Sequence, residues 1–532
     1  MSFLDQKKTK RLFAIHGWSG IALGVLLYVI VLTGAVAVFA HEIGVWSVGG
    51  AANDKGLTQP VDRIIRGLAD KVDPKYRDDV GAYTVESGAL SVFFHTHETK
   101  PNGDIGDRGV RFLVDPATGS VLSRAEGWSS DIYGQDQASA LKRFLIDLHV
   151  QLYLPSPWGL ILTGILGLAM MVAATSGLIM HRHILKDIFV APRPGNLLLH
   201  ARDRHVLAGT WGLPFAFLLA FTGSFLSFAF TIGMPIVSMS AFGGDKMLVG
   251  EILGGHAQTE DKTPAVVTNL DAVLADGQQR AGSAPTYIHV GHWGRADAKV
   301  GVWFEPPAGD LGFLQLGFNG VSGAFEGQKP RVGSKPSFGA TASSVLTALH
   351  YGLFAGLLSK IIWLSLGLAS CYVILTGMVM WFTRRREDPA WAPWTRMVPA
   401  IGYGLPLAML VSAHFYFQAI GRSDTATWTP WGFALATLAV IAAAVAMSDR
   451  VELTRRLVLA TAISAGLLPL ARMMAGGRSW GEAVAIGEPV VVSIDLLLLI
   501  AAAALTWHWK GSPQPQWLRR RLAAAAQPEP AE

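Results

Sequence analysis

Residues 11–39 read RLFAIHGWSGIALGVLLYVIVLTGAVAVF, an apolar stretch with a histidine near its start. A second stretch, residues 202–228, reads RDRHVLAGTWGLPFAFLLAFTGSFLSF. Three features of the first recur at a constant distance along the chain: His16 as His205, Gly20 as Gly209, and Thr33-Gly34 as Thr222-Gly223. A constant offset over three features predicts an internal repeat. The repeat places the same histidine twice.

The composition is typical of an integral membrane protein. Of 532 residues, 51% are hydrophobic and only 16% are charged, with a mean hydropathy of +0.36, whereas soluble proteins average about 25% charged residues. The net charge of +5 does not indicate nucleic-acid binding, because the basic residues cluster between apolar stretches as membrane topology requires. We therefore expect the protein to be embedded in a lipid bilayer and to bind no nucleic acid.

The chain has one cysteine, Cys371, inside an apolar stretch. A single thiol excludes an intrachain disulfide, a Cys-x-x-Cys-His haem attachment, an iron–sulfur cluster and a Cys-rich zinc site. Any redox cofactor would need other ligands, of which histidine is the obvious one.

The apolar stretches predict eight membrane helices, each near the ~20 residues needed to cross a bilayer. They cover residues 13–40, 157–181, 205–232, 355–382, 397–418, 430–448, 456–474 and 488–509. The basic connecting segments then share one side, which the positive-inside rule makes cytoplasmic. We expect a multi-pass protein of the bacterial inner membrane with both termini in the cytoplasm. The first stretch is expected to be a membrane helix and not a signal peptide, because it exceeds the ~7–15 apolar residues of such a segment and recurs later.

Two long loops would face the periplasm and fold as domains. VRFLVDPATGSVLSR in the first loop and LGFLQLGFNGVSGAFEG in the second each predict two strands joined by a turn. Each loop is therefore expected to form a small α+β domain on a mostly α-helical membrane protein. The predicted divisions are 1–40 (tail and first span), 41–156 (first domain), 157–232 (second and third spans), 233–354 (second domain), 355–386 (fourth span) and 387–532 (four-helix extension and tail).

The second half of each unit repeats as well. His149 in LHVQLYLP matches His350 in LHYGLF, and each precedes a span. Residues 11–382 are thus predicted to be two copies of a helix–domain–helix unit, related by a pseudo-twofold axis along the membrane normal. This axis would bring His16 opposite His205 near the cytoplasmic side, and His149 opposite His350 near the periplasmic side. Facing imidazoles suit a six-coordinate haem iron, so the pattern predicts two non-covalent, bis-histidine haem b groups.

Two simpler interpretations stay open. A single histidine at a membrane boundary is usually an interfacial residue, although four at matched positions favour a functional role. Gly20 and Gly209 lie one turn beyond His16 and His205 on the same helix face. A flat macrocycle needs that face free of side chains, and the Thr-Gly and Ser-Gly pairs would serve it in the same way. Small residues also simply mediate helix packing in membranes.

Other histidines carry weaker predictions. His181 ends the second span and is an alternative ligand of the cytoplasmic haem, although Trp381 stands at the corresponding place in the fourth span. His95 and His97, in FFHTHE, alternate along a predicted strand and point to one face. They suggest a weak periplasmic iron site, while solvated strand histidines are the simpler interpretation. His289 and His292, in IHVGHW of the second loop, carry the same two interpretations.

The sequence resembles the PepSY-associated transmembrane helix family, which includes bacterial inner-membrane ferric-siderophore reductases. The resemblance rests on LFAIHGWSGIALGVLLYVIVLTGAVAVF, VDPATGSVL, LHVQLYL and LHYGLF, and covers about residues 11–382. It implies PepSY-type outer domains, non-covalent haem and electron delivery to ferric chelates in the periplasm. The positions that match the family's repeated histidines are His16, His149, His205 and His350. The C-terminal four helices depart from the shorter members.

The leading hypothesis is a haem-dependent oxidoreductase that reduces a ferric siderophore or another Fe(III) chelate, with no catalytic residue beyond the haem ligands. Hard oxygen donors hold Fe(III) better than Fe(II), so one electron loosens the iron. The electron donor would be external, either quinol or a cytosolic reductase, because no dinucleotide-binding glycine motif appears. Two alternatives are a non-redox membrane anchor that binds a periplasmic partner, and a transporter for iron, haem or siderophore.

Overall fold

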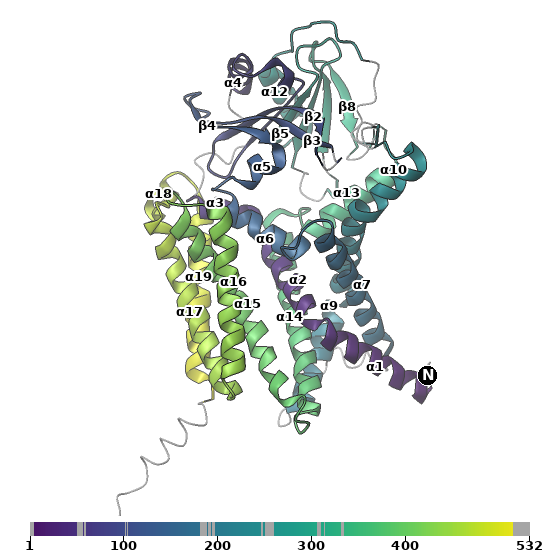
Figure 1. Cartoon of the computed structure of the whole chain (residues 1–532), viewed down its shortest axis with the longest axis vertical. Helices are drawn as coiled ribbons and strands as arrows, with labels where there is room; N and C mark the ends of the chain where they lie inside the picture. The colour runs from purple at the N-terminus through teal and green to yellow at the C-terminus, as the bar shows by residue number, and fades with distance from the viewer. Residues whose placement is uncertain are drawn as a thin grey trace, which may run out of the picture. The chain divides into compact units, whose positions relative to one another are not determined.

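The computed structural model describes residues 5–49, 57, 60–101, 103, 105–180, 189, 193, 197–245, 248–249, 260–305, 310–312, 314–330, 333 and 335–513. The protein is mostly helical and has a β-sheet (Figure 1). The chain divides into two compact units. The helical unit comprises Met1–Gly49, Ala140–Phe221 and Leu364–Glu532, and the sheet unit comprises Gly50–Ser139 and Thr222–Trp363.

The helices of the helical unit, or shared with it, are α1 (Gln6–Ala22), α2 (Gly24–Ala37), α3 (Ala40–Ser47), α6 (Ala140–Gln151), α7 (Trp158–Met180), α9 (Leu197–Phe228), α14 (Gly356–Arg384), α15 (Met397–Ala419), α16 (Thr425–Ala446), α17 (Arg450–Met474), α18 (Trp480–Ala485) and α19 (Pro489–Gly511). The other helices are α4 (Val61–Ala69), α5 (Ser129–Gly134), α10 (Met234–Phe242), α12 (Leu270–Ala281) and α13 (Phe338–Tyr351). The strands are β1 (Asp79–Thr84), β2 (Leu90–Thr99), β3 (Ile105–Val114), β4 (Val121–Trp128), β5 (Pro285–Gly291), β6 (Lys299–Phe304), β7 (Leu314–Asn319) and β8 (Phe325–Lys329).

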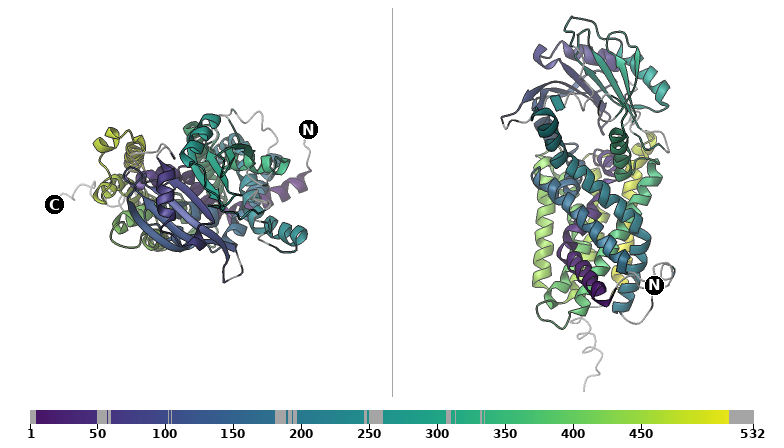
Figure 2. Two further views of the ribbon diagram at one scale, coloured as in Figure 1. Left: turned by 90° about the horizontal axis from the view of Figure 1, so that it is seen from above. Right: turned by 90° about the vertical axis from the view of Figure 1, so that its right-hand side faces the viewer.

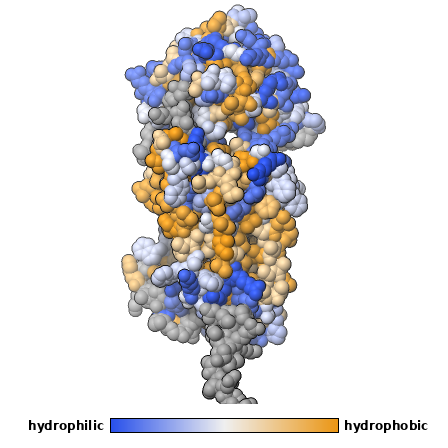
Figure 3. Space-filling model, turned by 90° about the vertical axis from the view of Figure 1, so that its left-hand side faces the viewer, coloured by the Kyte–Doolittle hydropathy of each residue, from blue (hydrophilic) through white to orange (hydrophobic). Residues whose placement is uncertain are grey.

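The chain is a multi-pass membrane protein. Within the described residues, seven helices are long and apolar enough to cross a membrane, and an eighth span exists if α1 and α2 count together. Their exposed side chains are largely apolar, as on α16 and α19 at Leu438, Val445, Leu497 and Ile500. Hydrophobic residues cover much of the visible face of these helices in Figure 3. A surface of this kind suits lipid rather than water.

The first span is not the continuous helix that residues 13–40 predict. The chain bends by 65° between α1 and α2, with Leu23 between them. Ser19-Gly20 and Gly24 flank the bend, and such small residues are a common cause of sharp kinks. Gly24 also marks a close approach of helices, since a Cβ there would lie 2.5 Å from Met378 Cε of α14.

The sheet unit contains one continuous sheet, so the two small separate domains expected from the loops are not found. Its eight strands follow the order β4-β3-β2-β1-β5-β6-β7-β8, and every neighbouring pair is antiparallel. The first four strands come from one loop and the last four from the other. They join where Asp79–Ala82 of β1 pair with Ile288–Gly291 of β5. The join removes two exposed edges, each of which would present unpaired backbone groups.

The two faces of this sheet have different characters. Helices α4 and α12 lie on one face (Figures 1 and 2). They bury Ile65 and Leu270 there against alternate sheet residues such as Val92 and Phe94. Because neighbouring residues of a strand point to opposite faces, the residues between these point away from α4 and α12. This second face carries the polar and titratable side chains described below.

The C-terminal helices pack into the helical unit around a buried ion pair. Arg472 of α17 and Asp495 of α19 are fully buried, with Nη2 2.7 Å from Oδ2. The carboxylate also accepts hydrogen bonds from Trp46 Nε1 of α3 at 2.8 Å and Trp480 Nε1 of α18 at 2.9 Å. Asp495, the main acidic residue of the predicted spans, thus has three partners. This indicates that the carboxylate has a structural role.

Asp495→Leu is expected to destabilise the protein strongly. The substitution leaves the Arg472 guanidinium buried without its counter-charge, which typically costs about 3–5 kcal/mol. We expect a clearly lower melting temperature of the detergent-solubilised protein. The double variant Arg472→Met/Asp495→Leu should recover much of the loss, because neither charge then stays unpaired. A melting temperature unchanged by Asp495→Leu would contradict a structural role for the pair.

Candidate functional site

Four half-buried histidines lie on four different helices. His16 is in α1, His149 in α6, His205 in α9 and His350 in α13. These are the histidines that the sequence repeat singled out. Each imidazole packs against a helix other than its own, and the contacts follow one pattern.

His16 packs against α7. Its Nδ1 lies 3.0 Å from the carbonyl oxygen of Ala173 and 3.1 Å from Ser176 Oγ. A Cβ on the next residue, Gly177, would lie 3.3 Å from His16 Cε1, a tight contact that glycine relieves. The ring edge therefore rests on the Ser176-Gly177 pair.

His205 repeats this arrangement on α14. Its Nδ1 lies 2.9 Å from the carbonyl oxygen of Val373 and 3.3 Å from Thr376 Oγ1. A Cβ on Gly377 would lie 3.3 Å from His205 Cε1. The carbonyl again comes from the residue four positions before the glycine, one helical turn away.

His149 packs against α2, also within the helical unit. Its Nδ1 lies 3.1 Å from the carbonyl oxygen of Ile30. A Cβ on Gly34 would lie 2.6 Å from His149 Cε1, closer than two such atoms approach in proteins. Position 34 must therefore be glycine for the ring to lie where it does.

His350 makes the corresponding contact within the sheet unit, on the last turns of α9. Its Nδ1 lies 2.9 Å from Thr222 Oγ1. A Cβ on Gly223 would lie 3.1 Å from His350 Cε1. As at the other three histidines, Nδ1 contacts the neighbouring helix and the ring edge lies against a glycine.

These contacts determine which ring nitrogen carries the proton. A carbonyl oxygen only accepts hydrogen bonds, so Nδ1 of His16, His149 and His205 is the protonated nitrogen and donates. Nε2 is then the unprotonated nitrogen, the form in which an oriented imidazole binds a metal. For His16 and His205, Nε2 has no hydrogen-bond partner among the described residues.

His16 and His205 lie close together within the helical unit. Their ring centroids are 6.2 Å apart and their planes are nearly perpendicular, at 82°. Two imidazoles on opposite sides of one metal, with metal–nitrogen bonds of about 2.0–2.1 Å, would have centroids roughly 6.3 Å apart. The centroid distance is therefore compatible with one metal ion shared by the two rings. An edge-on contact of aromatic rings covers the same distance range, so the available Nε2 atoms are what favours a metal.

The glycines near these histidines have two different roles. A Cβ on Gly20 would meet no described atom within 4 Å, and one on Gly209 would meet Val373 at 3.8 Å. Gly20 therefore borders the open space that a flat macrocycle beside His16 requires, whereas a Cβ on Gly209 would be in ordinary van der Waals contact with Val373. Four of the Ser-Gly and Thr-Gly pairs, those at 33–34, 176–177, 222–223 and 376–377, receive the edges of the imidazole rings.

Two further predicted positions have different outcomes. His181 lies outside the described residues. Trp381, at the corresponding place in α14, packs on Gly17 beside His16. Its indole Nε1 is buried without a hydrogen-bond partner among the described residues. The ring packs against Trp18, Trp391 and Arg385. It therefore belongs to an aromatic cluster near His16.

The second predicted pair is divided between the units. His149 belongs to the helical unit and His350 to the sheet unit. Each has its Nδ1 in contact with a neighbouring helix and its ring edge against a glycine. Their pairing on a second haem stays a prediction.

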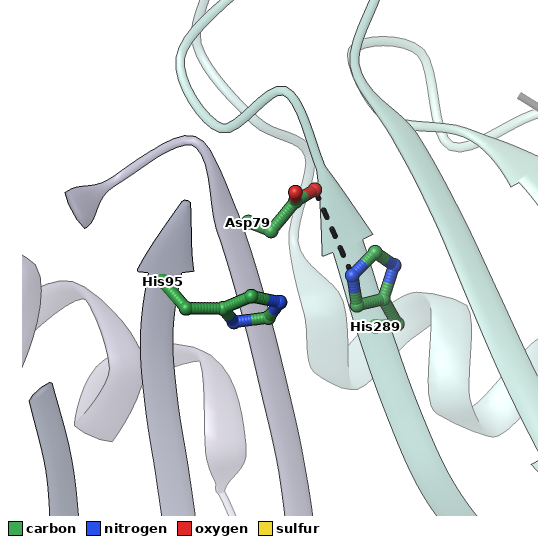
Figure 4. A group of neighbouring side chains, drawn as sticks. All are labelled: Asp79, His95 and His289. Atoms are coloured by element: carbon green, nitrogen blue, oxygen red, sulfur yellow. Dashed lines mark ion pairs between the residues drawn. The ribbon is translucent and has the colours of Figure 1, made fainter. Parts of the chain in front are cut away.

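The polar face of the sheet brings together titratable residues from three adjacent strands. Asp79 of β1, His95 of β2 and His289 of β5 offer ligand atoms that all lie within 4.8 Å of one another. Figure 4 shows the three side chains converging from their strands. Asp79 and His95 are buried, and His289 is partly buried. His95 of the predicted weak iron site therefore lies in a cluster of metal-binding residue types.

His97, the other half of that prediction, has a different role. Its Nδ1 lies 2.8 Å from Asp107 Oδ1 and its Nε2 3.3 Å from Asp79 Oδ2. His97 therefore bridges two carboxylates. The second imidazole of the cluster comes from His289 and not, as predicted, from His97. His292 lies apart, with Nδ1 3.1 Å from Asp297 Oδ2.

The charges in the cluster are divided unevenly. Hydrogen bonds to Asp107 and Asp79 raise the pKa of His97 to about 10, so this ring is protonated at neutral pH. Burial opposes ionisation of Asp79, but its hydrogen bond with His97 and the nearby imidazoles hold its pKa at about 2. Burial lowers the pKa of His95 below its ordinary value. An ionised carboxylate and a neutral imidazole thus lie side by side.

Asp79 was missed at the level of the sequence. Nothing in the local pattern marks it, because its significance comes from pairing opposite His95 on one side and Gly291 on the other. The contacts between each repeated histidine and a glycine were missed too. The constant offset of the Thr-Gly pairs from the histidines was the available signal.

The family model described as the PepSY-associated TM region matches residues 13–384. The match includes all four repeated histidines and ends where α14 ends, before α15–α19. The chain is also similar to a protein of Pseudomonas aeruginosa named "Uncharacterized protein PA4219". The two are 24% identical over an alignment 399 residues long, which covers 71% of this chain and 95% of that protein.

Proposed function

Because the chain belongs to the family of the PepSY-associated TM region, we propose that it is a membrane oxidoreductase that holds two haem b groups and reduces Fe(III) in a siderophore chelate. The observation that carries this proposal is the fourfold repetition of one contact. In each case a histidine has Nδ1 held by a neighbouring helix and its ring edge set against a glycine. Such outer contacts orient metal-bound histidines.

In this proposal His16 and His205 hold one haem, and His149 and His350 hold the other. Haem b bound by two histidines supplies a one-electron carrier with no open coordination position. The carbonyls of Ala173, Val373 and Ile30 keep the ring orientation and the proton on Nδ1, so that Nε2 is the unprotonated nitrogen that would bind the iron.

The orientation of the protein in the bilayer would place the electron donor and the electron acceptor on opposite sides of the membrane. By the positive-inside rule the ends of the spans near His16 and His205 face the cytoplasm of a bacterium, where quinol or a cytosolic reductase would be the donor. The sheet unit would lie in the periplasm with the Fe(III) chelate. Reduction of that iron by one electron leaves Fe(II), which hard oxygen donors bind less well.

A spectrum and a rate test the proposal together. Protein purified in detergent should show a Soret band, two haems per chain by pyridine haemochrome, and oxidation of the reduced protein on addition of a ferric siderophore. Trapping of the Fe(II) product with a ferrous chelator would confirm that the iron is reduced.

The alternatives predict different results. A preparation without a Soret band would remove the redox function and leave the membrane anchor. Uptake of ferric siderophore into liposomes without reductant would favour the transporter. Against transport, Asp495, the main acidic residue of the spans, is held by Arg472 and two indoles.

A further inference from the structure

We propose that Asp79, His95 and His289 form a binding site for one divalent first-row transition-metal ion. Two imidazoles and one carboxylate are the donor set of the 2-His-1-carboxylate sites that hold Fe(II) with positions left open. That the occupant is the Fe(II) released by the reductase rests on the proposed function. The binding of a divalent metal does not.

The pairing of the strands places the three donors on one face. Asp79 is directly opposite His95 across β1 and β2, and His289 lies opposite Gly81 across β1 and β5. Positions 79 and 81 of β1 share a face, and so do 289 and 291 of β5. In Figure 4 the His95 ring extends from β2 toward Asp79 and His289.

The distances are those of a site slightly wider than its metal-bound form. His289 Nε2 lies 3.6 Å from Asp79 Oδ1, and all three ligand atoms lie within 4.8 Å of one another. Two ligands on one metal with bonds of about 2.1 Å lie roughly 3.0–3.4 Å apart at angles near 90–110°. Movements of about an ångström, within the reach of side-chain rotation, would close the site.

Glycines keep the space around the donors clear. Gly291 lies opposite Asp79, and a Cβ there would lie 3.2 Å from Asp79 Oδ1. Gly81 lies between Phe93 of β2 and His289 of β5. A side chain at Gly291 would project toward Asp79 and His289 and compete with a ligand for room, whereas a Cβ at Gly81 would collide with the Tyr287 hydroxyl.

The simplest alternative is a purely structural set of ion pairs. An ion pair with His97 accounts for one oxygen of the Asp79 carboxylate, because the His97 ring faces Oδ2. His97 is held more closely by Asp107, at 2.8 Å against 3.3 Å. The other oxygen, Oδ1, faces His289. His95 is buried next to this carboxylate. An ion pair with His97 does not account for two further imidazoles converging on Asp79.

Cobalt(II) binding to the full-length protein tests the site, with Co²⁺ standing in for Fe²⁺. Equilibrium dialysis gives the stoichiometry, and cobalt K-edge absorption gives the ligands without interference from haem iron. We expect one Co²⁺ per chain with imidazole and carboxylate ligands. Asp79→Asn, His95→Gln and His289→Gln should each weaken Co²⁺ binding at least about tenfold. Substitution of a residue that only supports a metal ligand already lowers metal affinity by about that factor.

His292→Asn is the matched control. It removes a histidine one residue beyond β5 that is bonded to Asp297 rather than to the cluster. It also preserves the positive φ of 55° at this position, which asparagine tolerates well. Binding should be unchanged. An unaltered Soret band and melting temperature would show that each variant is folded.

Two results would overturn the site: no bound Co²⁺ in folded wild-type protein, or binding that survives all three ligand substitutions. Either result leaves the reductase proposal standing, because the haem spectrum and the reduction rate are measured separately. Conversely, a haem-free preparation that binds Co²⁺ through these residues would support the metal site and refute the reductase.

Discussion

His205→Ala is expected to lower the haem content of the purified protein from two groups to one. His205 and His16 face each other at 6.2 Å, and alanine leaves the iron with one protein ligand instead of two. The remaining haem, on His149 and His350, should keep its low-spin spectrum, because its proposed ligands lie on other helices. Pyridine haemochrome analysis and a redox titration that loses one of two midpoints measure the effect.

His200→Ala is the control for this variant. It removes a histidine from the same helix, α9, but His200 is only half-buried and its Nδ1 contacts the backbone carbonyl of Arg193. Its haem content should match the wild type. Retention of both haems in His205→Ala, or loss of both in a folded protein, would count against the assignment. His149→Ala and His350→Ala should each remove the other haem and leave the first.

Gly34→Ala is expected to weaken binding of the second haem roughly tenfold or more, the usual cost of disturbing the contacts that orient a metal-bound histidine. The added methyl would lie 2.6 Å from His149 Cε1. The ring must then rotate or retreat, which breaks its hydrogen bond to Ile30. Haem retained through dialysis against an apo-protein acceptor measures the loss.

The other glycines of the pattern should rank by distance. The corresponding contact is 3.1 Å at Gly223 and 3.3 Å at Gly177 and Gly377, so the same substitution should cost less in that order. Gly466→Ala in α17 is the control, since its Cβ would make an ordinary 3.5 Å contact with Ala502. A full complement of haem in Gly34→Ala with an unshifted spectrum would disprove the steric role of position 34.

Some of this protein follows from its sequence alone. The membrane spans follow from apolar runs of sufficient length, because lipid requires a continuous apolar surface and a fully bonded backbone. The strands of the sheet follow from alternation and turn residues, and β3, β4, β7 and β8 lie where VRFLVDPATGSVLSR and LGFLQLGFNGVSGAFEG place them. The family is shown for residues 13–384, as the resemblance indicated. The choice of His16, His149, His205 and His350 came from the offset between the repeats.

The tertiary structure decided which residues meet. No local pattern shows that β1 pairs with β5, and this pairing both joins the two loops into one sheet and brings His289 to Asp79. Likewise, only the packing of α17 on α19 reveals that Asp495 is neutralised by Arg472. Hydropathy and turn chemistry act between residues close in sequence, whereas strand pairing and helix contacts join residues on different elements, 23 positions apart for Arg472 and Asp495 and much farther for Asp79 and His289. The sequence therefore determined the elements and the repeated histidines, and the fold determined their partners.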